Sequence, residues 1–527
     1  MFKNRKLLSI IILVLTAAFL VTGCGGGGNS QSGKEDGNTL VIAIPEEIEG
    51  TDISQINWEN IVHTLMYEPL VSFDLQLKEV LPAAASSYEI LDGGKQIKFT
   101  IPEDACFANG DPLTAEDIKL ALERHKEISP YAEDLEPVKE IVVEDPQTLI
   151  FKMDSPAAFL WPVLTSVYSG IADAKKAEEL GKEAFNRQAV GNGPYLVEEW
   201  VQGSHITLVK NPKYKTNNPV VENKGAAKID KIIVRFIPEN FTRISELKSG
   251  NTDIVVNVPI ETLEELKKNQ DIELYEYMQT GVDYLSINTE VEPLNDVRVR
   301  KAIAMAIDKD ELNQVLKGTV VPRYGLLSQA QLCYDEKAEE EFKKQYGYNV
   351  EKAKQLLEEA GYKANSEGIM EKDGKPLSIT LMVALDSPFM KQAAPIMQAQ
   401  LQKAGINLEL REYEIKYIKQ MMYDHTYEMA TRYYWWSDPD ILYYIFHSEA
   451  GYPWSNPEVD KLIEEARYIM DMDERTAKYN EIQSKILDEM PGIPLFSEYQ
   501  YLAARKNVKG LQVGVDGKVY INDVTKE

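Results

Sequence analysis

The chain has 527 residues, of which 57 are Lys or Arg and 84 are Asp or Glu, so its formal net charge at pH 7 is −27. Such a charge repels nucleic acid and anionic lipid, which excludes a nucleic-acid-binding function. Three cysteines in 527 residues exclude a disulfide scaffold, and the length predicts several lobes rather than one core.

The beginning of the chain is typical of an export signal. Basic residues precede the apolar run Leu7–Val21, which as a helix would span roughly 22 Å, short of the roughly 30 Å hydrocarbon core of a bilayer. The run ends in Val21-Thr22-Gly23-Cys24, which resembles a bacterial lipoprotein signal; a plain signal peptide is the alternative. We expect residues 1–23 to be removed, Cys24 to carry the lipid, and the polar, glycine-rich residues 24–37 to form a flexible tether.

Strands and helices are predicted to alternate through the first half of the body. Leu40–Ile44 reads as a buried strand, Trp58–Leu70 as a helix and Ile97–Ile101 as a half-buried strand. Thr114 and Asp117 have the spacing of a capping box at a helix start. The other elements expected in this half are strands at 205–209, 232–237 and 253–256, and a helix at 243–249 that ends at Gly250.

The alternation continues in the second half. A strand at 284–288 precedes a helix that Asp296 caps and that runs through Ala306, and Asn349 caps a later helix that ends at Gly361. Residues 377–411 read as strand, helix, strand, which implies a right-handed crossover between parallel strands. Helices are also expected at 456–468 and 474–487. The predicted class is therefore α/β in more than one lobe.

The segment 431–447 is unusually rich in aromatic side chains. Its rings are those of Tyr433, Tyr434, Trp435, Trp436, Tyr443, Tyr444 and Phe446, and Asp438-Pro439-Asp440 forms a turn among them. Successive side chains of a strand point to opposite faces, so Trp435 and Trp436 cannot both face one core. We interpret the segment as the wall of a ligand cleft with Asp438 as a charged anchor; an ordinary buried aromatic cluster is the alternative.

The sequence contains no recognisable catalytic or cofactor motif. It lacks a Gly-x-Ser-x-Gly elbow, a His-Glu-x-x-His pair, a phosphate loop and a dinucleotide fingerprint. The five histidines are far apart and have no metal-ligand spacing, His447 being the one near the aromatic segment. We therefore predict a binding protein without metal or other cofactor, not an enzyme. Cys106 and Cys333 are expected to be buried thiols, with a bridge between them as the alternative.

Several motifs occur in a specific order and spacing. They are Phe107–Ile118, Gly191–Tyr195, Asn211–Tyr214, Leu294–Ala302 with Ala306–Asp308, Ala353–Tyr362 and Pro491–Pro494. Together they resemble the family 5 extracellular solute-binding proteins, the oligopeptide-, dipeptide- and nickel-binding components of ABC importers. The resemblance implies a class II periplasmic-binding-protein-like α/β fold, with two lobes that close on a ligand by a hinge and an extra domain inserted in the first lobe. The implied boundaries are 38–76, 192–281 and 495–527 for the first lobe, 77–191 for the insert and 282–494 for the second lobe.

The resemblance also indicates where a peptide would be held. In peptide-binding members, Arg-x-Gly-Trp followed by a carboxylate and an Asp-Pro turn lines the cleft, and the carboxylate pairs with the α-ammonium group of the peptide. Here Arg432-Tyr433-Tyr434-Trp435 matches the first part, with Tyr434 in place of Gly, but the interval to Asp438-Pro439-Asp440 is shorter. If the family motif is aligned at Arg432, Asp438 occupies the position of the amine-binding carboxylate. Aligned from the turn, Trp435 takes it and Asp438 is a turn residue.

These observations lead to one expected function. The chain should be a substrate-binding lipoprotein of an ABC importer that captures di- or oligopeptides and delivers them to a permease–ATPase complex. The ligand-binding residues expected are Arg432, Tyr434, Trp435, Trp436, Asp438 and Tyr284. An oligosaccharide or metal chelate stacked on the two tryptophans is the alternative ligand. We expect a monomer anchored through Cys24 to the outer face of the cytoplasmic membrane, or located in the periplasm.

Overall fold

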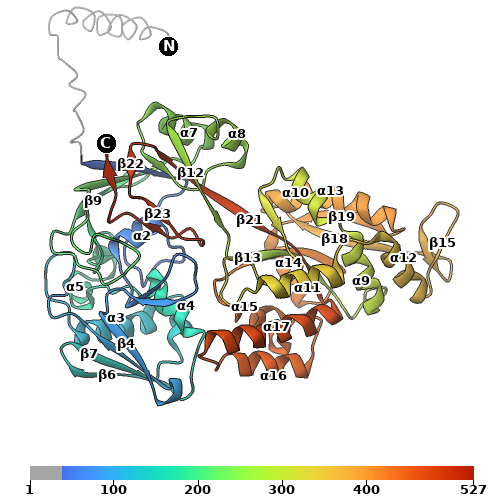
Figure 1. The fold of residues 1–527 in the computed structure, drawn as a ribbon, viewed down its shortest axis with the longest axis horizontal. Coiled ribbons are helices and arrows are strands. Elements are labelled where there is room, and N and C mark those ends of the chain that lie inside the picture. The colour runs from blue at the N-terminus through green and yellow to red at the C-terminus, as the bar shows by residue number, and fades with distance from the viewer. Residues whose placement is uncertain (1–37) are drawn as a thin grey trace, which may run out of the picture. The chain divides into compact units, whose positions relative to one another are not determined.

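The computed structural model describes residues 38–527 (Figure 1). The predicted signal, the tether and the anchor at Cys24 lie outside these residues. Among the helices of residues 38–527, none is both long and apolar enough to cross a bilayer.

One half of the main sheet is built around β1 (Thr39–Ile44), which is buried along its whole length. It pairs in parallel with β10 (Lys231–Phe236) and with β11 (Ile254–Val255). Antiparallel pairs then join β10 to β9 (His205–Lys210) and β9 to β8 (Tyr195–Val201). The near-continuous apolar sequence of β1 is that of a strand covered on both faces. The predicted strands β1, β9 and β10 are confirmed, whereas β8 was not predicted.

The other half of the sheet contains the predicted crossover. β18 (Ser378–Ala384) lies between β19 (Asn407–Tyr413) and β20 (Met429–Trp435) and is parallel to both. Helix α13 (Pro388–Lys403) connects β18 to β19, so the strand–helix–strand order and the parallel pairing are confirmed. β20 pairs on its other side with β13 (Gly281–Ile287), antiparallel.

The long strand β21 (Gly492–Arg505) joins the two halves (Figure 1). Its first residues pair with β13 and with β14 (Val320–Pro322), and its later residues pair with β12 (Ile272–Met278) and β11. The strand order is β19-β18-β20-β13-β21-β11-β1-β10-β9-β8. β13 and β21 are therefore the neighbours at which the two halves meet. Pro491–Pro494 follow the end of α17 at Glu489 and lead directly into this strand, which was not predicted.

A separate antiparallel sheet has the order β4 (Ser87–Leu91), β5 (Gln96–Thr100), β7 (Thr148–Lys152) and β6 (Glu140–Asp145). Helix α3 (Ala115–Ile128) belongs to the same segment of the chain. The Thr114 hydroxyl accepts from the Asp117 amide, and the Asp117 carboxylate accepts from the Thr114 amide at 2.9 Å. The predicted capping box is confirmed.

The other helices include those predicted near 58–70, 243–249, 296–306, 349–361, 456–468 and 474–487, together with others that were not predicted. They are α2 (Ile61–Met66), α4 (Leu160–Thr165), α5 (Ala174–Leu180), α6 (Lys182–Phe185), α7 (Asn240–Ser249), α8 (Leu263–Leu266), α9 (Val297–Ala306), α10 (Lys309–Val315), α11 (Glu336–Tyr346), α12 (Val350–Glu359), α14 (Ile415–Tyr423), α15 (Ile441–Phe446), α16 (Pro457–Ala466) and α17 (Met472–Glu489). Asp296 and Asn349 cap α9 and α12 as predicted. α2 is shorter than the predicted 58–70, because Asn60 caps its start and the backbone is extended again at Tyr67.

Short strands complete the chain. They are β2 (Val71–Phe73), β3 (Val80–Pro82), β15 (Lys363–Ala364), β16 (Met370–Lys372), β17 (Lys375–Pro376), β22 (Val508–Lys509), β23 (Gln512–Val513), β24 (Val519–Tyr520) and β25 (Thr525–Lys526). β23 and β24 form a hairpin, and the residues around it contribute to the cavity described below.

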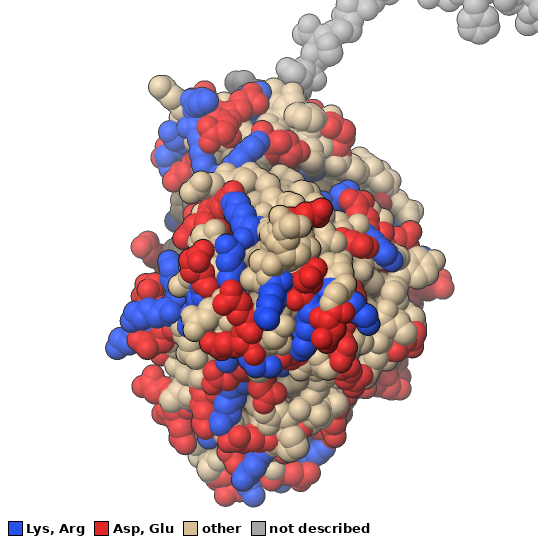
Figure 2. All heavy atoms as spheres, turned by 90° about the vertical axis from the view of Figure 1, so that its right-hand side faces the viewer, with Lys and Arg blue, Asp and Glu red and all other residues tan. Residues whose placement is uncertain are grey.

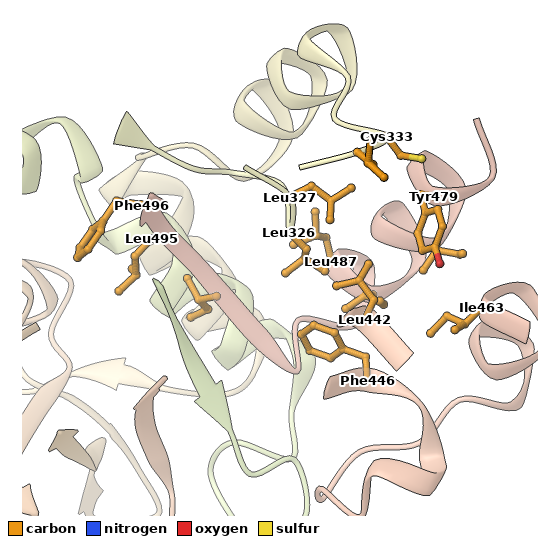
Figure 3. Close-up of a cluster of buried hydrophobic side chains, with 14 of the residues drawn as sticks. Leu326, Leu327, Cys333, Leu442, Phe446, Ile463, Tyr479, Leu487, Leu495 and Phe496 are labelled. Atoms are coloured by element: carbon orange, nitrogen blue, oxygen red, sulfur yellow. The ribbon is translucent and has the colours of Figure 1, made fainter. Parts of the chain in front are cut away.

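A buried cluster supports the aromatic segment (Figure 3). Its labelled members are Leu326, Leu327, Cys333, Leu442, Phe446, Ile463, Tyr479, Leu487, Leu495 and Phe496. These side chains come from α15, α16, α17, the first part of β21 and the segment before α11, and they belong to one buried cluster. The Cys333 thiol is buried in this cluster, as predicted, whereas Cys106 is only half-buried. Both cysteines are free, so the alternative of a bridge between them is wrong.

Candidate functional site

A cavity of about 560 Å³ lies where β20 ends. Its lining comes from residues within segments 58–64, 73–77, 162–168, 435–437 and 514–520, and from Tyr131, Asp134, Val256 and Thr280. Residues near both halves of the main sheet, and residues from the segment that carries the β4–β7 sheet, thus contribute to one space. A volume of this size is typical of a site for a small ligand.

Trp435 and Trp436 line the cavity from the end of β20. Trp435 is 52% exposed, and its ring stacks on that of Tyr433 with a centroid separation of 4.7 Å. Trp436 is half-buried, and its backbone amide donates to the Thr280 carbonyl at 2.7 Å. Neither indole belongs to a core, so both rings are available to a ligand. Their contact with a ligand stays a prediction.

Aromatic side chains from other parts of the chain form a second wall of the cavity. Trp58 is 72% exposed and lines the cavity, just before the cap of α2. Tyr131 and Tyr168 also line it, with ring centroids 4.7 Å apart, and both hydroxyls donate to the Asn57 carbonyl. Sequence reasoning missed this wall because Trp58 was assigned to a helix that enters the core. Trp58 precedes Asn60, the cap residue of α2, and this order was the sequence signal that Trp58 lies outside the helix.

Asp438 does not line the cavity. Its side chain is 0% exposed, and both carboxylate oxygens accept from Arg475 at 2.7 Å. One of them also accepts from the Asp440 amide at 2.8 Å, inside the turn that starts α15. In this structure Asp438 is therefore a turn residue, which is at odds with an amine-anchoring role.

Arg432, Tyr434 and Tyr284 lie on the other face of the sheet from Trp435, and none of them lines the cavity. Alternation along β20 requires this, since residues 432 and 434 point away from the face of 433 and 435. Tyr284 and Tyr434 are 3% and 7% exposed, with ring centroids 5.6 Å apart. The Tyr434 hydroxyl donates to the Leu326 carbonyl, and burial raises the pKa of both tyrosines. The structure thus separates these predicted site residues from the two tryptophans.

The cavity lining is predominantly acidic. It carries the carboxylates of Glu59, Asp74, Asp134 and Asp516 and the single ammonium group of Lys518. The low-dielectric surroundings raise the pKa of Glu59 to about 7, although its side chain remains accessible, and raise that of Asp134 to about 6. Crowded carboxylates of this kind favour protons or other cations in the space between them.

A second hollow of about 320 Å³ adjoins the first and shares Tyr131, Asp134, Val163 and Trp436 with it. Glu133 and Glu136 add carboxylates to its lining. Its basic residue, Arg467, lies 3.1 Å from the Asp440 carboxylate.

Metal ligation has no support in the part of the chain that the structure describes. No group of three His, Cys, Asp or Glu side chains there is arranged to hold an ion. His447 is 5% exposed, lies 3.4 Å from Glu464 and stacks on Tyr443, away from both cavities.

Comparison with known proteins adds independent information. The profile of the bacterial extracellular solute-binding proteins, family 5 (middle region), matches residues 79–454. The oligopeptide-binding protein AppA of Bacillus subtilis (strain 168) is 27% identical, with 96% of each chain covered. Among solved structures, HbpA2 from Haemophilus parasuis has a TM-score of 0.81 at 23% identity, covering 93% of this chain and 100% of that one. NikA from Brucella suis, in complex with Fe(III)-EDTA, has a TM-score of 0.78 at 23% identity, with 93% and 100% covered. These similarities confirm the predicted fold class.

Proposed function

This chain belongs to the bacterial extracellular solute-binding proteins of family 5, and we propose that it captures peptides for an ABC importer and hands them on unaltered. The observation that carries the proposal is the cavity at the end of β20, which draws its lining from both halves of the main sheet. A ligand in that space contacts both halves at once. Closure of one half onto the other would then enclose the ligand and expel water.

The hinge of this movement is assigned to β13 and β21. They are the neighbouring strands at which the two halves meet, and β21 takes part in both. We accordingly propose the lobes as 38–76, 192–281 and 495–527 for the first and 282–494 for the second, with 77–191 inserted. These boundaries cut the main sheet within β13 and β21.

Peptides are the proposed ligands because the chain is similar along nearly its whole length to an oligopeptide-binding protein. Trp435, Trp436 and Trp58 are proposed as the contact surface, since rigid rings provide large apolar area at a low entropic cost. We place Asp438, Arg432, Tyr434 and Tyr284 behind that surface, as its support. A metal chelate stacked on the indoles is the second candidate, favoured by the exposed tryptophans and by the Fe(III)-EDTA complex of the similar NikA.

The cell envelope is the proposed location. The lipoprotein-like Val21–Cys24 sequence supports a diacylated or triacylated anchor at Cys24, and a single lipid chain would hold the protein too weakly. A permease–ATPase complex is the proposed partner, and the protein is proposed to work as a monomer.

Thermal-shift measurements on the mature protein, residues 24–527, test the ligand class. The panel contains short peptides, oligosaccharides, and nickel and iron chelates, and native mass spectrometry checks for a co-purified ligand. A ligand at a hundred times its Kd stabilises the folded state by about 2.7 kcal/mol, which a melting curve resolves. Shifts with peptides alone support the proposal. Shifts with chelates or sugars alone replace it by the second candidate or by sugar capture.

A further inference from the structure

We propose that the cavity selects peptides that carry lysine or arginine side chains, which its unpaired carboxylates and exposed indoles receive. This proposal rests on the proposed peptide capture and specifies its substrate class. It depends on the charges of the cavity lining, on their partners and on the position of the aromatic rings.

The carboxylates of Glu59 and Asp134 have no hydrogen-bond or ion-pair partner within residues 38–527, although Lys518 acts on Glu59 electrostatically. Both of them line the cavity. Asp74 differs, because its carboxylate accepts from the backbone amides of Lys78 and Glu79 in its own turn. Asp516 accepts from the Lys518 amide at 3.0 Å. Glu59 and Asp134 are therefore the groups free to bind an incoming cation.

Lys518, the basic residue of this lining, does not compensate the excess of acid. Its ammonium group donates to the Thr165 carbonyl at 3.3 Å and to the Ser72 hydroxyl at 3.4 Å. Glu59 and Asp516 also act on it electrostatically. With one cation against four carboxylates, the cavity favours a positively charged guest.

The adjoining hollow extends the acidic region. Glu133 and Glu136 line it together with the shared Asp134, while Arg467 is committed to Asp440 at 3.1 Å. On the molecular face that Figure 2 turns to the viewer, blue basic and red acidic side chains are intermixed.

Indole rings complete the receptor. Trp58, which precedes α2, and Trp435, at the end of β20, line the same cavity and are 72% and 52% exposed. Tryptophan is the best aromatic partner for an ammonium or guanidinium group. A Lys or Arg side chain in the cavity can lie against the face of an indole and donate hydrogen bonds to a carboxylate.

The test compares peptides of one length that differ at one position, where the residue is Lys, Arg, Gln or Glu. Isothermal titration of the mature protein should give at least about tenfold tighter binding for Lys and Arg than for Gln, and the weakest binding for Glu. The advantage should shrink as the ionic strength rises. At pH 7 the basic peptides should also release protons, because a cation lowers the pKa of Glu59, which is about 7 in the free protein. Proton release is measured by repeating the titration in buffers of different ionisation enthalpy.

Variants connect the effect to its residues. Glu59→Gln and Asp134→Asn should each reduce the preference for Lys over Gln several-fold, and Glu59→Gln should abolish most of the proton release. Glu340→Gln is the control, since Glu340 is exposed on α11 and lines neither hollow. Melting curves establish that each variant is folded.

The outcomes separate the two proposals. If Gln and Glu peptides bind as tightly as Lys and Arg peptides, charge selection is overturned while peptide capture stands. The same holds if both cavity variants keep the full preference for Lys. If no peptide binds, the proposed function fails and this inference fails with it.

Discussion

Arg475 and Asp438 form a fully buried bidentate ion pair with both N–O distances at 2.7 Å. The pair joins α17 to the turn that follows Trp435 and Trp436. Because that turn begins α15, the ion pair fixes where β20 ends and where the two indoles project. Its function is to hold the wall of the cavity in place from behind.

Asp438→Asn tests this relationship. Removing one partner leaves the Arg475 charge buried without compensation, so the free energy of unfolding should fall by about 3–5 kcal/mol. The Kd of the folded protein for a peptide should change little, since Asp438 does not reach the cavity. Chemical denaturation and titration calorimetry measure the two quantities. Unchanged stability together with lost binding would instead favour the alignment in which Asp438 holds the α-ammonium group.

Trp435→Ala tests the aromatic wall. The side chain is 52% exposed, so its removal should cost the fold little, whereas affinity should fall by about tenfold or more. Tyr468→Ala is a matched control, because Tyr468 is 51% exposed and lines neither hollow. Titration of the two variants with the same peptide measures the difference. Equal affinities for the two variants would remove Trp435 from the binding surface.

A carboxyl pair at the proposed hinge predicts a pH dependence. Asp283 on β13 and Glu498 on β21 are 2% and 8% exposed. Burial raises the pKa of Asp283 well above its usual range, and raises that of Glu498 to about 7. The pKa of Glu498 is thus higher in the folded state than in the unfolded state, where it is near 4.5. Such a group stabilises the fold below pH 4.5, and this contribution is lost as the pH rises to about 7. The melting temperature should therefore fall between pH 5 and pH 7.

Glu498→Gln should flatten this decline and raise the melting temperature at pH 7 relative to the parent protein. Burial also raises the pKa of Glu59 and Glu68 to about 7 and that of Asp134 and Asp440 to about 6, so part of the decline should remain. His63 and His125, whose pKa burial lowers to about 4, act in the opposite direction up to their unfolded-state value near 6.5 and so reduce the decline. Lys309, whose pKa burial lowers to about 7, acts in the opposite direction above that pH. Glu273→Gln, on the exposed side of β12, is the control. Parallel pH profiles for Glu498→Gln and the parent protein would contradict the assignment.

Local sequence signals predicted much of the fold. Apolar runs located β1 and β10, and the cap residues Thr114 and Asn349 located helix starts, because both depend on neighbours in the chain. β21 escaped prediction because Pro491 and Pro494 look like a helix end, while its pairing depends on strands more than 170 residues earlier.

The candidate site could be predicted only in part. The two adjacent indoles were identified from strand alternation, and both line the cavity. We did not apply the same alternation to Arg432 and Tyr434. Because β20 runs to Trp435, alternation places these two side chains on the opposite face of the sheet from Trp435. The partner of Asp438 lies 37 residues away on another helix, so no local pattern could reveal that its carboxylate is occupied.

Gly281→Ala tests the pairing of β13 with β20, in which Gly281 lies opposite Trp435. A Cβ atom at Gly281 would lie 1.6 Å from the Tyr434 carbonyl oxygen, so the backbone of β13 or β20 must shift. Such overpacking typically costs about 1–3 kcal/mol of stability. Because Gly281 pairs with Trp435 in the β13–β20 register, the shift should also move the indole and weaken peptide binding. Gly225→Ala is the control, since the nearest atom to its Cβ would be 3.7 Å away and its φ is not positive. If Gly281→Ala is destabilised but binds peptide normally, the position of Trp435 does not depend on this strand pair.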